Sequence, residues 1–295
     1  MESIPYDKRS GKIWFNGKTV DWADANIHVL NHGLHYASCV FEGEMVYGGE
    51  IFKLEEHTER LFYSAKRMGI DVPYAQEEIN EACRNIVNIQ KVQNGYVRPL
   101  IWRGSEMMAI SAQQTKTHVA IATWEWGSYF DPKLKVDGIR LNISNWRRPA
   151  PNTIPWDTKA SGLYMICTLS KHEAEKQGYT DSLMLDHEGN IAEATGANVF
   201  FKDKNGEIHT PIPDSFLDGI TRRTVIEIAK SKNIKLHERK ISPSELSNFV
   251  GCFLTGTAAE VTPVSCIAEN QFKVCETIID LNESYQALVR KKKIA

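Results

Sequence analysis

The sequence predicts a two-domain protein of the α/β or α+β class with mixed sheets. The chain has 295 residues, about twice the length of a typical domain. Strand and helix patterns alternate along it, which favours mixed sheets over a fold built from one element type. Residues 126–132 combine turn chemistry with aromatic side chains, as a connection between domains does. We therefore expect a smaller N-terminal α/β domain over residues 1–128, a loop over 129–135 and a larger domain over 136–295.

The helices and strands of the first domain are predicted from the periodicity of its hydrophobic residues. Apolar side chains recur at steps of three and four in residues 54–68 and 77–90, which predicts two helices. Gly69 ends the first of them. Runs rich in β-branched and aromatic residues predict strands, at residues 12–15, 41–52 (a pair around a Gly-Gly turn), 96–102 and 119–124. Asn16-Gly17 follows the first strand, and this dipeptide favours a tight hairpin.

The second domain begins with a strand and then an irregular segment. Residues 148–155 contain three prolines, which remove backbone donors and exclude a regular helix or central strand. Helical period predicts helices over 161–177 and 219–232. The expected strands lie at residues 139–144, 182–185, 191–193, 198–202 and 251–254.

Composition and charge exclude several classes of protein. Lys plus Arg total 35 and Asp plus Glu total 37, which argues against a nucleic-acid binder because such proteins carry a basic excess. No apolar run approaches the roughly 18 residues of a membrane span, and the charged N-terminus is not a signal peptide. The six cysteines are scattered and form no tight ligand pair, so we expect no metal site and a reducing, cytoplasmic setting.

Lys159 is the first residue with notable chemistry. It lies at the end of a proline-fixed loop, just before a predicted helix. A lysine held in a pocket by such a backbone loses solvation, which lowers its pKa and makes it a nucleophile. Taken alone, a solvated surface lysine is the commoner interpretation.

Three further stretches offer groups for an anion or a planar ring. Glu193 stands among small residues, which would let a ring approach the backbone. Residues 218–223 place a Gly-Ile-Thr step at a predicted helix start, where N–H groups and a hydroxyl suit a phosphate. Residues 255–260 form a small-residue loop that could make a second anion nest. Their ordinary alternatives are a solvated glutamate, a helix cap and a common loop.

Together these stretches meet the requirements of pyridoxal 5′-phosphate. That cofactor needs a phosphate site, a lysine for its aldehyde and a carboxylate for its ring nitrogen. The sequence also lacks the GxGxxG and GxxxxGK[ST] fingerprints, so dinucleotide and nucleoside-triphosphate binding lose their best evidence.

Several long motifs in one order point to a family. They are His32-Gly33-Leu34-His35-Tyr36, Val40-Phe41-Glu42-Gly43, Tyr96-Val97-Arg98-Pro99-Leu100-Ile101, and Ala150-Pro151-Asn152-Thr153-Ile154-Pro155 leading to Lys159. With them the chain resembles the class IV (fold-type IV) pyridoxal-phosphate aminotransferases, and among these the bacterial branched-chain amino-acid aminotransferases. The similarity runs nearly end to end. It implies two domains with the cofactor in the cleft between them.

The resemblance also implies a role for each cofactor-binding residue. Lys159 corresponds to the Schiff-base lysine that also moves the proton, and Glu193 to the carboxylate on the ring nitrogen. Tyr164 corresponds to the hydroxyl partner of the ring oxygen, and Leu217 to the residue against the ring face. The implied phosphate ligands are Arg60, Ile220, Thr221 and Thr257.

The substrate site is implied in the same way. Tyr96, Arg98 and the Thr257–Ala258 backbone resemble the carboxylate-recognition set. The apolar pocket would consist of Phe41, Trp126, Tyr129 and Tyr164. Tyr36 matches a residue lent by the neighbouring subunit, so the implied unit is a homodimer or a higher homo-oligomer. The implied reaction transfers the amine of a branched-chain L-amino acid to 2-oxoglutarate, giving a 2-oxo acid and glutamate.

One position departs from the family pattern. Met45 stands two residues after the glycine of the Phe-Glu-Gly element, where a basic residue is usual. Carboxylate recognition could therefore differ, which keeps a D-amino-acid or (R)-amine transaminase of the same fold as an alternative. A lyase of the family would share the lysine chemistry. A non-catalytic binding protein is opposed by the retention of Lys159, Glu193, Arg60 and Thr221.

Overall fold

A computed structural model describes residues 4–127, 130 and 132–290. The chain divides into two compact units. The first unit comprises the residues up to Gly127 together with the short segment Thr158–Gly162, and the second comprises the remaining described residues. The sequence alone placed that segment in the larger domain, whereas its contacts lie in the first unit.

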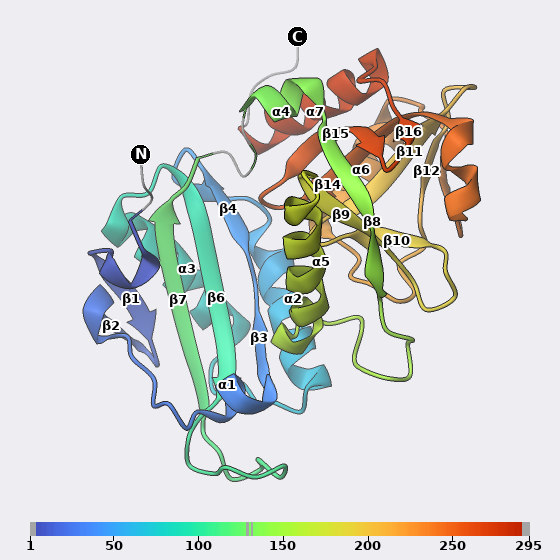
Figure 1. The fold of residues 1–295 in the computed structure, drawn as a ribbon. Coiled ribbons are helices and arrows are strands. Elements are labelled where there is room, and N and C mark those ends of the chain that lie inside the picture. Colours follow the sequence, from blue (N-terminus) through green and yellow to red (C-terminus); the bar gives the residue numbers. More distant parts are fainter. Residues whose placement is uncertain (1–3, 128–129, 131, 291–295) are drawn as a thin grey trace. The chain divides into compact units, whose positions relative to one another are not determined.

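The first unit is an antiparallel sheet with helices on one face (Figure 1). Its strand order is β2-β1-β7-β6-β4-β5, and β3 pairs with another part of β6. The strands are β1 (Lys12–Phe15), β2 (Lys18–Asp21), β3 (Cys39–Phe41), β4 (Glu44–Tyr47), β5 (Glu50–Ile51), β6 (Asn94–Arg103) and β7 (Thr117–Glu125). The helices are α1 (His32–Tyr36), α2 (Leu54–Arg67) and α3 (Gln76–Gln90). Helices α2 and α3 pack on each other and on the sheet.

Local sequence explains these elements. Helix α2 buries Leu54, His57, Leu61 and Ala65, the three- and four-residue steps that predicted it. It ends before Gly69, whose φ of +64° suits a residue without a Cβ. The Asn16-Gly17 hairpin between β1 and β2 is likewise confirmed.

The second unit is built around a ring of strands (Figure 1). The order β10-β9-β8-β15-β14-β11 closes because β10 also pairs with β11, while β12, β13 and β16 extend it. The strands are β8 (Ile139–Arg147), β9 (Asp181–Leu185), β10 (Ile191–Ala194), β11 (Asn198–Asp203), β12 (Ile208–Thr210), β13 (Leu236–Glu238), β14 (Phe249–Gly256), β15 (Glu260–Ile267) and β16 (Asn270–Gln271). The ring encloses an apolar core that includes Leu141, Leu183, Val199 and Leu254.

Helices cover the outside of this ring. They are α4 (Pro132–Asp137), α5 (Met165–Lys176), α6 (Ile220–Ser231) and α7 (Glu276–Val289). Helix α5 packs on β8 and β9, and α6 and α7 pack on each other and on β14. None of the described helices is both long and apolar enough to cross a membrane.

Some elements differ from the sequence-based expectation. Residues 161–177 form a 3-10 turn at Ser161–Tyr164 before α5, and not one continuous helix. Helix α4 occupies part of the expected connecting loop, because Pro132 is tolerated at a first helical position. Helices α1 and α7 and strands β12, β13, β15 and β16 were not predicted. Strands β12, β13 and β16 have only two or three residues, which carry too little periodicity to be recognised.

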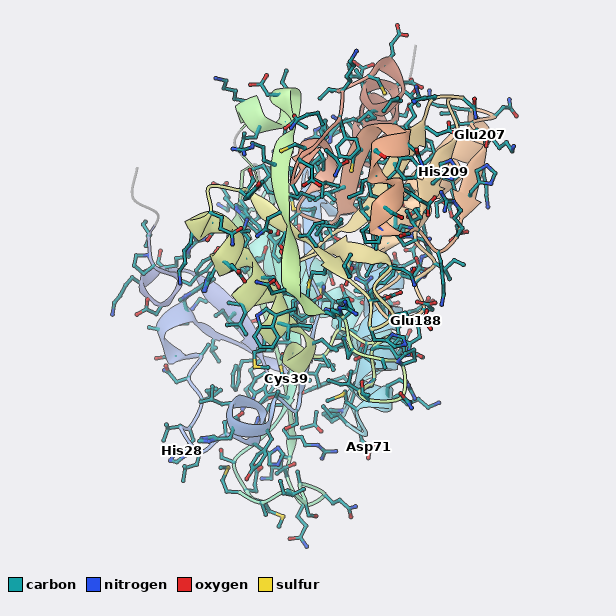
Figure 2. All side chains as sticks on the ribbon, turned by 45° about the vertical axis from the view of Figure 1, so that its right-hand side comes forward. His28, Cys39, Asp71, Glu188, Glu207 and His209 are labelled. Carbon is teal, nitrogen blue, oxygen red and sulfur yellow. The ribbon has the colours of Figure 1, made fainter. Side chains whose placement is uncertain are left out.

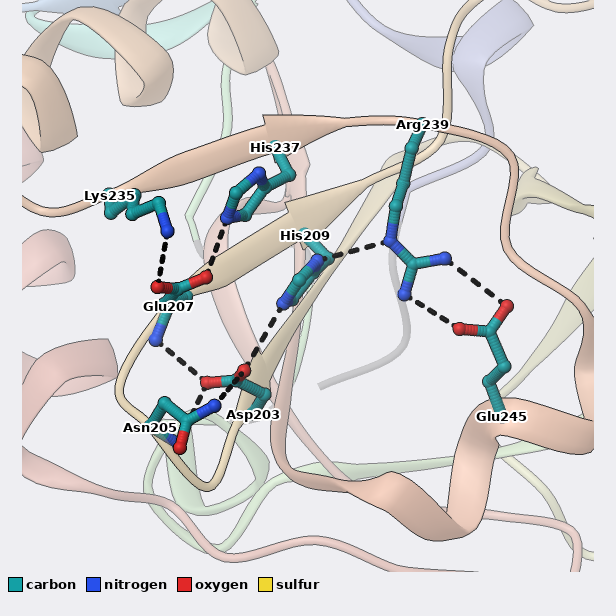
Figure 3. A network of polar contacts seen from close by, with 8 residues as sticks. All are labelled: Asp203, Asn205, Glu207, His209, Lys235, His237, Arg239 and Glu245. Carbon is teal, nitrogen blue, oxygen red and sulfur yellow. Dashed lines mark hydrogen bonds and ion pairs between the residues drawn. The ribbon is translucent and has the colours of Figure 1, made fainter.

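A polar network joins the β11–β12 turn to β13 (Figure 3). Asp203 Oδ1 accepts the backbone N–H groups of Asn205 and Glu207, at 2.9 and 2.8 Å, which fixes the turn. Glu207 in turn binds His237 on β13 at 2.6 Å and Lys235, the residue before β13, at 2.7 Å. These contacts tie an edge strand to its neighbour.

The same network contains residue types that bind metals. Ligand-type atoms of Asp203, Glu207 and His209 lie within 4.8 Å of one another, and Glu207 and His209 lie side by side in Figure 2. However, Arg239 Nε donates to His209 Nδ1 at 3.2 Å. Because Nδ1 accepts this bond, the ring proton lies on Nε2, 3.5 Å from Asp203. Burial lowers the pKa of His209, which acts in the same direction. The protonated Nε2 has no lone pair for a metal, and we interpret the group as an ion-pair network.

Glu44 is an unusual core residue of the first unit. Its side chain on β4 is fully buried, and neither carboxylate oxygen has a hydrogen-bond partner among the described residues. Burial, and next to it the charge of Glu42, raise the pKa of Glu44 well above its ordinary value of 4.5. The folded protein therefore holds a proton that the unfolded chain releases. This lowers the free energy of unfolding as the pH rises above that ordinary value.

We predict that Glu44→Gln, which mimics the neutral acid, stabilises the protein at alkaline pH. Its free energy of unfolding should exceed that of the parent by at least about 1 kcal/mol at about pH 8.5, with a smaller gain at about pH 5. Urea unfolding at both pH values measures this, with the exposed Glu59→Gln as control. A gain independent of pH would contradict a protonated Glu44.

Candidate active site

The expected site residues divide between the two units. The first unit contains Lys159, Arg60, Phe41, Tyr96, Arg98, Trp126 and Tyr36. The second contains Glu193, Tyr164, Leu217, Ile220, Thr221, Thr257 and Ala258. Tyr129 lies outside the described residues.

Lys159 is held in the first unit through its backbone. Its N–H donates to Ser64 Oγ on α2 at 3.0 Å, and its carbonyl accepts the Phe41 N–H on β3 at 3.2 Å. The next residue, Ala160, forms an antiparallel bridge with Val40. Three contacts to a strand and a helix thus fix the origin of the lysine side chain.

The side chain of Lys159 lies beside an aromatic ring and among charged groups of both signs. Its Nζ is 4.9 Å from the centre of the Phe41 ring. Burial is the main cause that lowers the pKa of Lys159, and the cations Arg60 and Arg98 act in the same direction against Glu42. A lysine of lowered pKa carries a larger share of the neutral amine, which is the nucleophilic form.

Glu42 organises the charges around this lysine. Its fully buried carboxylate accepts from Arg60 Nε at 2.6 Å and from Arg60 Nη2 at 2.9 Å, and it binds His57 Nδ1 at 2.7 Å. Although burial opposes ionisation, Arg60 and His57 hold the pKa of Glu42 well below its usual range. Such a two-pronged contact fixes the guanidinium plane of Arg60. The sequence showed Glu42 only as part of a motif, because its partners were recognisable only after folding.

Tyr96 and Arg98 point to the same face of β6, as residues two apart do in a strand. Arg98 Nη2 donates to the Tyr96 hydroxyl at 3.3 Å, and the guanidinium carbon lies 4.6 Å from the Phe41 ring centre. The Trp126 ring packs edge-on against Tyr96 at 4.7 Å. A Cβ at position 43 would overlap the Tyr96 hydroxyl, so Gly43 is required for this approach. The structure therefore brings Phe41, Tyr96, Arg98 and Trp126 together.

Two other residues of the first unit complete this description. Met45 is buried and lies opposite Tyr96 in the β4–β6 ladder, so an apolar side chain borders the tyrosine. Tyr36 ends helix α1, is 43% exposed and stacks on His32 with ring centres 4.5 Å apart.

In the second unit Glu193 is buried on β10. Its carboxylate lies 3.3 Å from Arg148 Nε and accepts from Asn198 Nδ2 at 3.2 Å. Asn198 Nδ2 also donates to the Leu217 carbonyl at 2.9 Å. Neither Arg148 nor Asn198 was assigned a role from the sequence, because only the closed ring of strands brings them to Glu193.

Helix α6 begins next to Leu217. Gly219 caps it, and the buried Ile220 and Thr221 form its first turn. The N–H groups of a first helical turn have no intrahelical partners and favour anions. The sequence-based expectation of a helix start at this Gly-Ile-Thr step is confirmed.

The remaining expected residues flank other helix and strand ends. Tyr164 is half-buried and immediately precedes α5. Thr257 and Ala258 are half-buried in the turn between β14 and β15. A small-residue turn of this kind offers backbone N–H groups at its surface.

Sequence comparison identifies relatives of this chain. The family model described as amino-transferase class IV matches residues 39–267. A probable branched-chain-amino-acid aminotransferase of Rickettsia bellii is 43% identical over 282 residues, covering 94% of this chain and 96% of the relative. The branched-chain-amino-acid aminotransferase of Pseudomonas aeruginosa is 42% identical over 260 residues, covering 87% and 84%.

Solved structures share the fold. The Escherichia coli branched-chain amino acid aminotransferase superposes with a TM-score of 0.93 at 35% identity and covers 97% of both chains. The branched-chain amino acid aminotransferase of Thermobaculum terrenum, solved in its PLP-form, gives a TM-score of 0.89 at 28% identity, covering 96% of this chain and 95% of that one. These matches confirm the expected fold-type IV architecture. The chain belongs to the class IV aminotransferase family.

Proposed function

We propose that this protein is a pyridoxal 5′-phosphate-dependent aminotransferase. It transfers the amine of branched-chain L-amino acids to 2-oxoglutarate, and the products are branched-chain 2-oxo acids and L-glutamate. The observation that carries the proposal is Lys159, a lysine of lowered pKa fixed by its backbone to β3 and α2. Relatives at 39–43% identity that are named for this activity support it.

The residues present fit the cofactor. Its aldehyde requires an amine, which Lys159 supplies. Its phosphate requires cations and free N–H groups, and these match Arg60 and the Ile220–Thr221 helix start. Its ring nitrogen requires a carboxylate, and Glu193 is a buried one.

When bound, pyridoxal 5′-phosphate withdraws electrons from the substrate Cα, which makes the Cα proton labile. We propose that Lys159 would hold the cofactor through its amine and would carry this proton, since burial lowers the pKa of that amine. Glu193 holds the proton on the ring nitrogen. The proposed roles of the other residues are ring-oxygen partner for Tyr164, ring packing for Leu217, and phosphate binding for Arg60, Ile220, Thr221 and Thr257.

Substrate recognition divides into charged and apolar parts. Tyr96, Arg98 and the Thr257–Ala258 backbone are proposed to bind a substrate carboxylate, and the Arg98–Tyr96 contact at 3.3 Å orients both donors. Phe41, Trp126, Tyr129 and Tyr164 are proposed to line the pocket for the aliphatic chain. The packing of Phe41 and Trp126 around Tyr96 and Arg98 supports this pairing.

A D-amino-acid or (R)-amine transaminase of the same fold is the alternative. The observation that favours it is Met45, which places a buried apolar side chain opposite Tyr96. Loss of a cation there would weaken binding of a substrate carboxylate in this region.

We further propose a homodimer or higher homo-oligomer in which Tyr36 reaches the partner's site. Apolar side chains are exposed around α1 and the adjoining loop, namely Ile27, Val29, Leu30, Leu34, Met108 and Ile110. The His32 ring bonds to the Ala109 carbonyl, so the two segments are neighbours. Such a patch on a small globular protein supports a contact with another chain.

A cytoplasmic location is proposed from the cysteines. All six are free, and five of them are buried. A disulfide found in protein isolated without reductant would contradict this location.

We predict that L-leucine alone converts the cofactor in the loaded protein to its pyridoxamine form. The yellow absorption band should be lost and the pyridoxamine form should appear, because the first half-reaction needs no acceptor. Visible spectroscopy measures this, with D-leucine and an (R)-amine as comparisons. A band that only the D-amino acid or the amine discharges would favour the alternative, with Met45 as the first residue to change.

We also predict that Tyr36→Phe changes kcat/KM for one substrate and not for the other. Loss of one hydrogen bond to the far carboxylate should lower kcat/KM for 2-oxoglutarate about tenfold, with little change for L-leucine. Steady-state kinetics with both substrates and sedimentation of the parent protein test this. The matched control is Tyr63→Phe, since Tyr63 is also an exposed tyrosine. A fully active monomer, or equal losses for both substrates, would contradict the proposed lending of Tyr36.

A further inference from the structure

Each carboxylate oxygen of Glu193 has its own buried partner. Oε1 lies 3.3 Å from Arg148 Nε, and Oε2 accepts from Asn198 Nδ2 at 3.2 Å. Arg148 and Asn198 are both 4% exposed. In an interior of low dielectric, contacts on both oxygens restrict the rotation of the carboxylate.

Arg148 is itself immobilised. Its backbone N–H donates to the Leu185 carbonyl at 2.7 Å, and it begins the proline-rich segment. Its Nη1 donates to the Leu163 carbonyl at 3.4 Å and contacts Cys167 Sγ at 3.3 Å. A buried guanidinium costs desolvation energy that a carboxylate offsets. The position of Arg148 therefore opposes protonation of Glu193.

Asn198 connects Glu193 to the start of α6. Its second Nδ2 hydrogen goes to the Leu217 carbonyl at 2.9 Å, and its Oδ1 accepts the Gly219 N–H at 3.1 Å. A Cβ at position 219 would overlap this Oδ1, so the approach requires glycine. One amide thus links the carboxylate to the first turn of a helix.

We propose that Arg148 and Asn198 are positioning residues for Glu193. Arg148 keeps the buried carboxylate ionised, and Asn198 sets its orientation relative to the N-terminus of α6. The consequence for catalysis rests on the proposed function, in which an ionised Glu193 holds the proton on the cofactor's ring nitrogen. The ion pair itself is a property of the protein without cofactor and can be measured there.

The deciding experiment is a double-mutant cycle on the cofactor-free protein. Urea unfolding is compared for the parent, Arg148→Gln, Glu193→Gln and the double variant. We expect Arg148→Gln to lower the urea midpoint and at least half of this loss to disappear when residue 193 is Gln, because no buried carboxylate has then lost its guanidinium partner. Equal losses in both backgrounds would overturn the proposal, since Arg148 would then act only through Leu163 and Cys167.

The proposal can still be tested if a single variant fails to fold. If Arg148→Gln does not fold, the proposal requires that the double variant Arg148→Gln/Glu193→Gln folds better than the single one. A double variant that fails equally would overturn it. The control is the exposed neighbour Arg147→Gln, whose Nη1 contacts the His187 carbonyl and which should show no coupling to residue 193.

A second readout uses the cofactor. Titration of the protein with pyridoxal 5′-phosphate should give about tenfold weaker binding for Arg148→Gln, with recovery in Arg148→Lys because the cation returns. Arg148→Lys as weak as Arg148→Gln would contradict a role based on charge. If the cycle shows coupling but no variant or parent binds the cofactor, the proposed function fails while the Arg148–Glu193 assignment stands.

Discussion

The candidate chemistry depends on the docking of a five-residue segment. The residues before and after Thr158–Gly162 belong to the second unit, yet this segment packs in the first unit. Two backbone hydrogen bonds, to Ser64 on α2 and from Phe41 on β3, fix Lys159 within it. Because these bonds involve the main chain of Lys159, they hold the origin of its side chain. Without this docking, Lys159 would be neither buried nor close to the cations Arg60 and Arg98.

Charge burial in the first unit then sets the state of the Lys159 amine. Arg60 and His57 share the carboxylate of Glu42 and lower its pKa, while the pKa of Glu44, which lacks such partners among the described residues, is raised. The pKa values of two buried glutamates two residues apart are thus shifted in opposite directions. The second unit applies the same rule, since Arg148 and Asn198 surround Glu193. In each unit a side chain with a proposed role lies next to buried residues that set its charge environment.

Local pattern predicted much of this protein, and long-range packing explains the remainder. Helix α2 and the β1–β2 hairpin were predictable because period and turn chemistry act over a few residues. The motifs predicted Lys159 and Glu193 as candidate site residues, and they predicted the start of α6, which is confirmed. They did not locate the docking of Thr158–Gly162, the Glu42–Arg60 pair or Arg148, since these contacts join residues 18 or more positions apart. Short strands such as β12 and β13 depend on neighbours in the sheet and leave no period of their own.

The most direct test of this account is to locate the lysine that holds the cofactor. The cofactor-loaded protein is reduced with borohydride, digested and analysed by mass spectrometry, and Lys159→Ala is treated in parallel. The lowered pKa and fixed backbone of Lys159 predict that the pyridoxyl label lies on this residue and is lost in the variant. A label on another lysine, or an undiminished yellow reducible adduct in Lys159→Ala, would contradict the assignment on which the proposed function rests.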